Sequence, residues 1–532
     1  MIKKILSIVI FSFALISCGG SNEVIPLTIN VGSEGRTLDP QLATDSTTTV
    51  VNTFLQEGLT RLDVNSKKIV PGLAKSWDLS KDGLVWTFYL RDNIKWSNGD
   101  EITANDFKYA WLRALNPDTA SEYAYMLFPI KNAKEYNAKK VKEDEIGIKV
   151  INDKTLEVTL NSVTPYFTSL TSFLTYLPVN EKFIKKVGSE FSLEADKILY
   201  SGPYKMVDWV HNAEMKLEKN ENYYDKDIIS DHKVVLKFIA DSTAALNIFK
   251  NDELDVVALS SEQYEKFKDD KRLHLVEDAT IWYLGFNHMN SSVLKNRKIR
   301  KAILQAIDKE KLVEIATNGI SKDIYNITPT GVGIEGFKTN DFALEVGETF
   351  SRFNKEEAKK LLKEGMRELN IDKMPTLSLI VNDGGVNKKF GEIIQEDLRK
   401  NLSIDINVEL VTFKERLART NAGDFDIVLR GWNADYKDPL TFLDLFVTNG
   451  GNNSGKYSNK EYDESIRIAQ TEKDPKKRFE ALKKAEKIAG EDVIVAILHQ
   501  PKKLYLVNPR VSNYAFYGIG VKFDFTRAKV KE

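Results

Sequence analysis

The sequence predicts a mixed α/β protein built from more than one domain. Strand-like and helix-like segments alternate along the chain, with no repeat period and no low-complexity tract. At 532 residues the chain is too long for one hydrophobic core, which favours two to three domains.

The first half contains a clear strand and a clear helix. Residues 85–91 alternate in hydrophobicity and are rich in aromatic and branched side chains, as in a half-buried strand. Thr103 and Asp106 predict a capping box, and the helix that it opens carries its apolar residues on one face. Pro117 follows Asn116 and ends this helix.

The second half continues the alternation. Residues 297–319 predict two short helices broken at Asp308, and residues 376–381 and 406–411 are typical of strands. Asp474 and Pro475 predict the start of a helix that stops at Gly490.

Composition excludes some classes of partner. Lys+Arg 76 against Asp+Glu 77 gives a net charge of -1, which provides no electrostatic reason to expect nucleic acid. The five histidines are scattered without ligand spacing, and no serine nucleophile motif is visible. We therefore expect no metal, no cofactor and no enzymatic activity.

The N-terminus predicts export and attachment to a membrane. Two lysines precede an apolar run at 5–16, which is too short to cross a bilayer but suits a signal peptide. Cys18, the only cysteine, follows shortly after this run, in a segment that resembles a bacterial lipobox. We expect residues 1–18 to be a lipoprotein signal peptide, Cys18 to be lipidated, and 19–23 to be a tether. A free thiol within an ordinary cleaved signal is the alternative.

The stretch GWNADYKDP at 431–439 is the most informative in the chain. It follows an apolar run at 425–429 that is typical of a short buried strand. Gly431 leaves the backbone accessible to another chain, Trp432 adds a large aromatic surface, and Asp435 adds an anion. This combination suits an extended peptide whose terminal ammonium meets a carboxylate.

The chain resembles the extracytoplasmic oligopeptide-binding proteins of ABC importers, in the peptide and nickel type of bacterial solute-binding protein family 5. The resemblance runs from about Leu27 to the last residues. Besides 431–439, it is carried in order by PGLAKSW at 71–77, VWTFYLR at 85–91, KWSNG at 95–99, TANDF at 103–107, NPDTAS at 116–121 and SGPY at 201–204.

The resemblance implies a two-lobed periplasmic-binding-protein fold, class II-like, with an extra third domain. Residues 24–46, 196–280 and 501–532 would form a discontinuous lobe I. Residues 47–195 would form the extra domain II, and 281–500 would form lobe III.

The resemblance also implies a ligand site. Gly431, Trp432 and Asn433 would offer backbone groups on one side of the peptide, and Glu34 and Gly35 would do so on the other. Asp435 would pair with the peptide α-ammonium, and Tyr109 and Tyr283 would lie near the ligand.

Several of these residues have structural alternatives. Asp435 could instead cap the helix predicted at 440–446. Trp432, Tyr109 and Tyr283 suit the hydrophobic core as well as a cleft wall.

The basic positions of the cleft depart from those of relatives, some of which carry an arginine two residues before the Gly-Trp pair. This chain has Leu429 there and Arg430 next to the glycine. A shift of one residue along a strand turns a side chain to the opposite face, so we expect Arg430 to point away. Asn387 stands where another relative has a histidine, and Arg419 is one residue from a basic position. We expect other groups to hold the peptide carboxylate.

Two glycine-rich stretches match the glycine spacing of nucleotide-binding motifs but lack the other features that such motifs need. Residues 331–336 lack the preceding strand and the following helix, and 450–456 lack the hydroxyl that would hold magnesium. Both predict loops.

The resemblance implies a substrate-binding lipoprotein of an ABC peptide importer. Its partners would be an oligopeptide, the permease and ATPase complex, and the membrane through the lipid anchor; we expect a monomer outside the cytoplasmic membrane. The alternatives are the same fold with a nickel chelate, haem, murein or signalling peptide, a surface adhesin, or an extracytoplasmic hydrolase.

Overall fold

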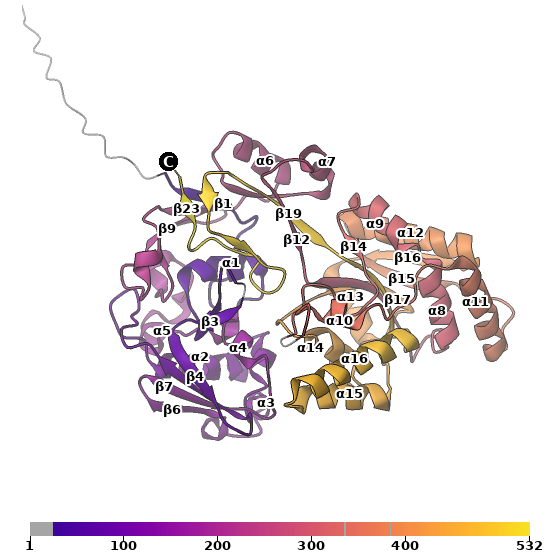
Figure 1. The fold of residues 1–532 in the computed structure, drawn as a ribbon, viewed down its shortest axis with the longest axis horizontal. Helices are drawn as coiled ribbons and strands as arrows, with labels where there is room; N and C mark the ends of the chain where they lie inside the picture. Colours follow the sequence, from indigo (N-terminus) through magenta and orange to yellow (C-terminus); the bar gives the residue numbers. More distant parts are fainter. Residues whose placement is uncertain (1–24, 67, 335–336, 384, 532) are drawn as a thin grey trace, which may run out of the picture.

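The computed structural model describes residues 25–66, 68–334, 337–383 and 385–531, so the predicted signal peptide, tether and Cys18 lie outside the described residues. Figure 1 shows two bodies side by side. The body at the left contains lobe I and domain II, and the body at the right is lobe III. Among the described residues, no helix is both long and apolar enough to cross a membrane.

Lobe I is built on a seven-stranded mixed sheet whose strands come from three separate parts of the chain. Its spatial order is β12 (Leu273–Glu277), β19 (Lys502–Val507), β11 (Val256–Leu259), β1 (Leu27–Asn30), β10 (Val234–Lys237), β9 (Glu214–Lys219) and β8 (Tyr204–Val210). The lobe adds α1 (Ser46–Leu55), α6 (Ser242–Lys250), α7 (Tyr264–Phe267) and the short pairs β20–β23 (Val511–Ser512, Lys529–Val530) and β21–β22 (Ala515–Phe516, Phe523–Asp524).

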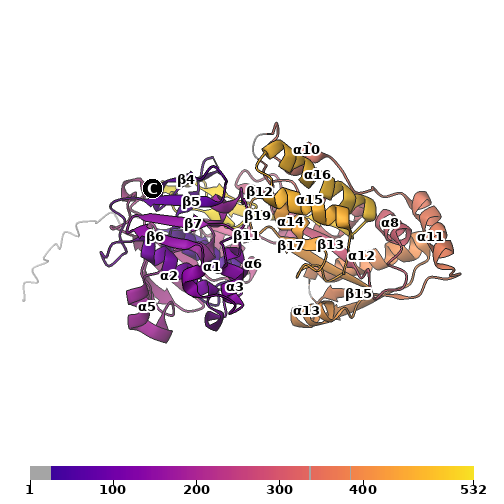
Figure 2. The same cartoon turned by 90° about the horizontal axis from the view of Figure 1, so that it is seen from below.

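Domain II is a four-stranded antiparallel sheet with helices packed against it (Figure 2). The sheet order is β4 (Ala74–Leu79), β5 (Val85–Leu90), β7 (Thr155–Thr159) and β6 (Ile148–Asn152). The remaining elements are the pair β2 (Thr60–Leu62) and β3 (Ile69–Pro71), and α2 (Ala104–Leu115), α3 (Ala133–Asn137), α4 (Phe167–Leu170) and α5 (Glu181–Val187). Phe88, Phe107 and Trp111 are fully buried between sheet and helices.

Lobe III is a six-stranded mixed sheet with helices on both faces. Its order is β14 (Lys322–Asp323), β18 (Val495–Gln500), β13 (Thr280–Phe286), β17 (Ile427–Asn433), β15 (Leu377–Asn382) and β16 (Ile406–Val411). On one face of the sheet the ring of Phe390 stacks on His499, with 4.5 Å between the ring centroids. On the other face the ring of Phe446 meets Tyr283 edge to face, with 5.9 Å between the centroids. The helices are α8 (Arg297–Ala306), α9 (Lys309–Thr317), α10 (Phe342–Val346), α11 (Lys355–Leu369), α12 (Gly385–Leu402), α13 (Phe413–Ala422), α14 (Leu440–Leu443), α15 (Lys460–Thr471) and α16 (Pro475–Asp492).

The helix α1 lies almost entirely beyond the boundary expected between residues 46 and 47, but it packs on the sheet of lobe I. Val51, Phe54 and Leu55 on α1 are buried in one cluster with Leu27 and Ile29 of β1. These apolar contacts make α1 part of the core of lobe I. The other sheets lie within the expected ranges, except that β13 begins one residue before 281.

Most local predictions agree with the structure. The capping box of Thr103 and Asp106 opens α2, Asn116 caps its end, and Asp308 separates α8 from α9. The expected stop at Gly490 is wrong. The α16 helix continues to Asp492, and Gly490 lies so close to Thr349 that a Cβ would be 2.3 Å from the carbonyl oxygen of Thr349.

Candidate functional site

The β17 strand has a backbone edge that no strand covers for most of its length. One side of β17 pairs with β13 throughout. On the other side, β15 pairs only with Ile427 and Val428. Within the described residues, the edge from Leu429 to Asn433 that faces β15 therefore has no strand partner. An edge of this kind can accept an added strand.

Gly431 is also required by packing inside the sheet. It lies opposite Trp282 on β13, and a Cβ on residue 431 would come within 3.0 Å of the Trp282 ring. Trp432 is half-buried against the core of lobe III, and its indole N–H is buried without a partner among the described residues. The glycine thus lets the Trp282 ring lie across the strand that carries the free edge.

A polar network fixes the end of β17. The amide of Asn433 donates to Asp278 at 3.0 Å and to Thr280 at 2.9 Å. The ammonium of Lys503 pairs with the same Asp278 carboxylate, which is buried. Since Asp278 and Lys503 lie where the chain passes between lobe I and lobe III, this network ties the free edge to the connection between the lobes.

Asp435 follows this anchored end and faces domain II. The hydroxyl of Tyr125 donates to its carboxylate at 3.5 Å. Burial raises the pKa of the Asp435 carboxyl to about 6, and the Tyr125 hydrogen bond acts in the opposite direction. No lysine, arginine or histidine among the described residues forms an ion pair with Asp435. The carboxylate is therefore partly buried at the cavity wall and has no ion-pair partner among the described residues.

The alternative role of Asp435 as a helix cap is wrong, because Asp438 takes that place. The Asp438 carboxylate accepts from the backbone N–H of Leu440, the first residue of α14, and pairs with Arg478 at 2.8 Å. Asp435 contributes only its backbone N–H, which donates to Thr441. The Asp435 carboxylate is thus not used by the helix.

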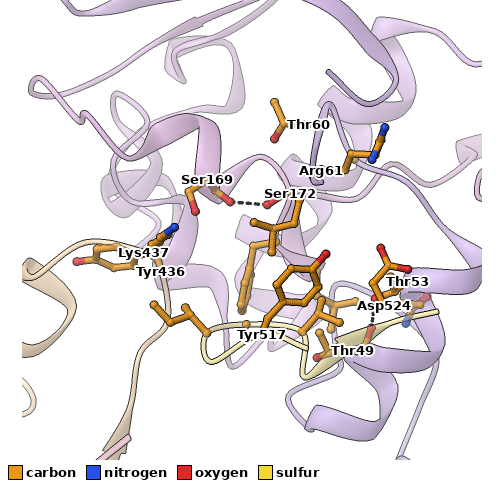
Figure 3. Close-up of a pocket in the computed structure, with 18 of the residues that line it drawn as sticks. Thr49, Thr53, Thr60, Arg61, Ser169, Ser172, Tyr436, Lys437, Tyr517 and Asp524 are labelled. Carbon is orange, nitrogen blue, oxygen red and sulfur yellow. Dashed lines mark hydrogen bonds between the residues drawn. The ribbon is translucent and has the colours of Figure 1, made fainter. Parts of the chain in front are cut away.

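A cavity of about 330 Å³, shown in Figure 3, has Asp435 among its lining residues. Lobe III provides Tyr436 and Lys437 to its wall. The Tyr436 ring also stacks on the ring of Tyr166 in domain II, with 4.2 Å between the ring centroids. This stacking is a direct contact between the two bodies. The opposite wall comes from lobe I and domain II and includes Thr49, Thr53, Arg61, Ser169, Ser172, Tyr517 and Asp524.

Sequence reasoning missed two tyrosines near Asp435. Tyr125 reaches the carboxylate directly, and Tyr123 has a pKa raised to about 12 by burial and by the negative charge of Asp435. Both residues follow the motif at 116–121 within four positions. That motif, together with the aromatic residues after it, could have indicated that these two tyrosines lie near the ligand site.

Glu34 and Gly35 lie in a turn of lobe I beside the N-terminus of α1. The Glu34 carboxylate accepts from the backbone of Asn212 and bonds the His211 ring at 2.7 Å. A Cβ on Gly35 would be 2.1 Å from the hydroxyl oxygen of Thr48, because this turn packs on the N-terminus of α1. Neither residue lines the cavity at Asp435.

Tyr109 and Tyr283 also lie outside this cavity. Tyr109 is half-buried on α2, where it packs against the core of domain II. Tyr283 is buried in the core of lobe III, and its ring lies under the guanidinium of Arg430 at 5.8 Å. Core packing accounts for the contacts of both rings, and their place near a ligand stays a prediction.

The basic residues considered for the peptide carboxylate do not line the cavity at Asp435. Arg430 shares a face of the sheet with Tyr283 and donates to the hydroxyl of Ser454 at 3.0 Å, so it is absent from the cavity that contains Asp435. Arg419 pairs with Glu409 at 2.6 Å and with Asp424 at 3.0 Å. Asn387 lies on α12 and does not line the cavity.

The glycine-rich stretches belong to loops in their described parts. Residues 331–334 form a turn and coil, while 335 and 336 lie outside the described residues. Asn453 holds the second loop by donating to the carbonyl groups of Val447 and Tyr457. In the described part of the chain, no cluster of acidic, histidine or cysteine side chains has the arrangement of a metal site.

Comparison with known proteins places this architecture in a family. Residues 68–454 match the sequence model described as bacterial extracellular solute-binding proteins, family 5 middle. The chain is 36% identical over 512 residues to the oligopeptide-binding protein OppA of Bacillus subtilis, covering 92% of each chain. It is 32% identical over 538 residues to a dipeptide-binding protein of Lactococcus lactis, covering 97% of this chain and 96% of the relative.

Solved structures agree over almost the whole length. Listeria monocytogenes OppA bound to peptide superposes with a TM-score of 0.78 at 34% identity, covering 95% of this chain and 99% of the other. The pheromone receptor PrgZ superposes with a TM-score of 0.79 at 32% identity, with the same coverage. Members of this family bind solutes and are not enzymes. With its two-lobed α/β fold, the chain belongs to the bacterial extracellular solute-binding proteins of family 5, in the peptide-binding group.

Proposed function

We propose that this protein is the substrate-binding lipoprotein of an ABC peptide importer, and that it captures extended oligopeptides between its two lobes. In this proposal the peptide adds to the free edge of β17, and its α-ammonium pairs with Asp435. The protein then delivers the peptide to a permease and ATPase complex. The protein acts as a monomer and needs no cofactor.

The observation that carries the proposal is the state of Asp435. Its carboxylate is partly buried, has a pKa raised to about 6, and has no cationic partner among the described residues. A buried charge of this kind is costly unless a partner arrives. The α-ammonium of a peptide supplies a charge-assisted hydrogen bond there.

The free edge of β17 explains how many sequences could be accepted. Main-chain hydrogen bonds from Leu429 to Asn433 would be the same for every peptide, so affinity would depend weakly on side chains. The network of Asn433, Asp278 and Lys503 holds this edge in place before the ligand arrives, which reduces the entropy lost on binding.

Calorimetry with matched peptides tests the proposal. A tetrapeptide and its N-acetylated form have the same backbone and side chains, but only the first carries the α-ammonium. We expect acetylation to weaken binding more than tenfold, about 1.4 kcal/mol or more. Equal affinities would reject the pairing with Asp435.

The lipid anchor is a second part of the proposal and has its own test. Cys18 lies outside the described residues, and its position after the apolar run at 5–16 supports lipidation. More than one acyl chain is needed for stable anchoring. Mass spectrometry of protein from the membrane fraction should show an acylated Cys18 as the first residue. An intact, unmodified N-terminus would reject this part.

A specialised peptide ligand is the second candidate. The relatives include a protein named as a murein peptide-binding protein and the pheromone receptor PrgZ. Asp435 suits any of these ligands that carry a free amine, so the choice among them depends on peptide length and side chains.

A further inference from the structure

Tyr166 and Tyr436 form an apolar contact between domain II and lobe III. Their rings stack with 4.2 Å between the centroids and 8° between the ring planes. Each ring packs against the core of its own body and also against the core of the other. Among the partly buried apolar side chains of the described residues, only these two pack against both cores. Figure 1 shows the neighbouring helices α4 and α14 on facing sides of the two bodies.

Both rings project from segments that are held firmly in their own bodies. Tyr166 directly precedes α4, and the next residue, Phe167, is fully buried among the aromatic rings of domain II. On the other side, the backbone N–H of Asp438 donates to the carbonyl of Tyr436, and the Asp438 carboxylate pairs with the buried Arg478. The stack therefore connects two well-supported segments.

The stack lies beside the carboxylate to which we assign the peptide ammonium. Asp435 is the chain neighbour of Tyr436, and both line the cavity of about 330 Å³. Ser169 of α4 lines the same cavity from the side of domain II (Figure 3). Tyr166 is not among the lining residues. The stack thus sets the separation between α4 and the turn that carries Asp435, and one of its two rings stays outside the cavity.

Movement of the two bodies against each other has to break this stack. The chain passes between lobe I and lobe III at 277–280 and at 500–502. A rotation about these crossings separates the two rings, which removes the aromatic contact and exposes both rings to water. An exposed polar contact resists such a rotation less: Lys389 of lobe III lies 4.0 Å from Glu262 of lobe I, and water can replace either partner.

We propose that Tyr166 is a positioning residue for peptide binding. Through its stack with Tyr436 it holds domain II against lobe III, and so keeps the cavity at Asp435 closed around the ligand. The identity of the ligand rests on the proposed function above, whereas the contact between the bodies does not. Since a ligand leaves the closed state slowly, the extra domain contributes to affinity through a side chain that lies outside the cavity.

Peptide dissociation from Tyr166→Ala tests this role. Loss of the aromatic pair should raise the dissociation rate of a tetrapeptide about threefold to tenfold. Tyr166→Phe keeps the ring and should match the wild type. Tyr136→Ala is the matched control, because Tyr136 packs against the core of domain II and not against lobe III. Displacement of a tetrapeptide labelled at its C-terminus measures the rates. A wild-type rate in Tyr166→Ala, or an equal increase in Tyr136→Ala, would overturn the proposal.

The separation of the two bodies is a second readout, and it needs no ligand. Without its first eighteen residues the protein contains no cysteine, so two introduced cysteines can carry spin labels. Asp153→Cys in domain II and Asp372→Cys in lobe III replace exposed residues. Electron–electron double resonance should show a population at the separation of this structure. Tyr166→Ala should lower the ratio of this population to wider ones by the same threefold to tenfold, and Tyr166→Phe and Tyr136→Ala should keep it.

The two readouts distinguish the role of Tyr166 from the identity of the ligand. If no peptide binds but Tyr166→Ala still separates the bodies, the stack keeps its role and the ligand assignment fails. Equal distance distributions in the wild type and Tyr166→Ala would overturn the proposal. A wild type without a population at the separation of this structure, with and without peptide, would also overturn it. If Tyr166→Ala does not fold, Tyr166→Leu removes the stack but keeps an apolar side chain, and the same outcomes decide.

Discussion

The hydroxyl of Tyr125 in domain II donates to the carboxylate of Asp435 in lobe III at 3.5 Å, and so links the two bodies of the protein. Asp435 is partly buried and has no cation of its own in the described part of the chain. The contact marks the place where a ligand ammonium would be held between the bodies.

Replacing Asp435 with asparagine should weaken peptide binding more than tenfold, about 1.4 kcal/mol or more, because a buried ammonium would lose its counter-charge. Isothermal titration calorimetry measures this directly. Asp372→Asn, on the exposed surface of lobe III, is the control and should bind normally. An unchanged affinity for Asp435→Asn would remove Asp435 from the site.

Tyr125→Phe should weaken binding by a smaller factor, since one hydrogen bond contributes about 0.5–1.5 kcal/mol. Tyr109→Phe should have no effect, because Tyr109 packs in domain II and does not line the cavity. Calorimetry of both variants distinguishes the role of Tyr125, which the structure suggests, from the role of Tyr109, which the resemblance implies. The opposite order of effects would favour Tyr109.

Peptide affinity should fall as the pH falls through about 6. The ligand needs the ionised carboxylate, and burial raises the pKa of Asp435 to about 6. Affinity should be full between pH 6.5 and 7.5, and below 6 it should fall by about tenfold per pH unit. It should also fall above about 8, where a peptide amine loses its proton. Binding by Asp435→Asn should not vary between pH 5 and 7; the same acid dependence in that variant would assign it to another group.

Asp435→Asn should also stabilise the ligand-free protein at neutral pH. The pKa of Asp435 rises from 3.8 to about 6 on folding, so its favourable contribution is present below pH 3.8 and is lost as the pH rises through 6. The ionised group then costs up to about 3 kcal/mol. Tm should therefore increase in the variant at pH 7.5 and change little at pH 4. A lower Tm at pH 7.5 would contradict the burial of this carboxylate.

Gly431→Ala should destabilise lobe III by about 1–3 kcal/mol, because the new Cβ would press on the Trp282 ring at 3.0 Å. Chemical denaturation followed by tryptophan fluorescence measures the change. Gly451→Ala, in a loop where a Cβ meets nothing within 4 Å, is the matched control. Equal stability of the two variants would mean that Trp282 moves without cost.

The sequence predicted what short segments specify by themselves. The capping box at Thr103 and the break at Asp308 depend on neighbours within four residues, and both appear as expected. The motif that singles out Asp435 is local in the same way, and its role in binding stays a prediction. The reversed face of Arg430 followed from the alternation of side chains along a strand.

Long-range packing decided the rest. Glu34 looked available in sequence, but His211 and Asn212 approach it from another part of lobe I. The α16 helix continues past Gly490 to Asp492, and the backbone of Thr349 packs against Gly490. Tyr125 bonds Asp435 although the two residues are 310 positions apart in the sequence. No local pattern contains these contacts, although the motif at 116–121 marked the neighbourhood of Tyr125.

Native mass spectrometry of the soluble protein, purified from cells without its first eighteen residues, tests the central claim most directly. Retained ligand should appear as a series of masses that correspond to peptides with free N-termini, and the series should be lost in Asp435→Asn. A single non-peptide mass, or a protein that is empty and ignores a peptide library, would contradict a role in peptide capture.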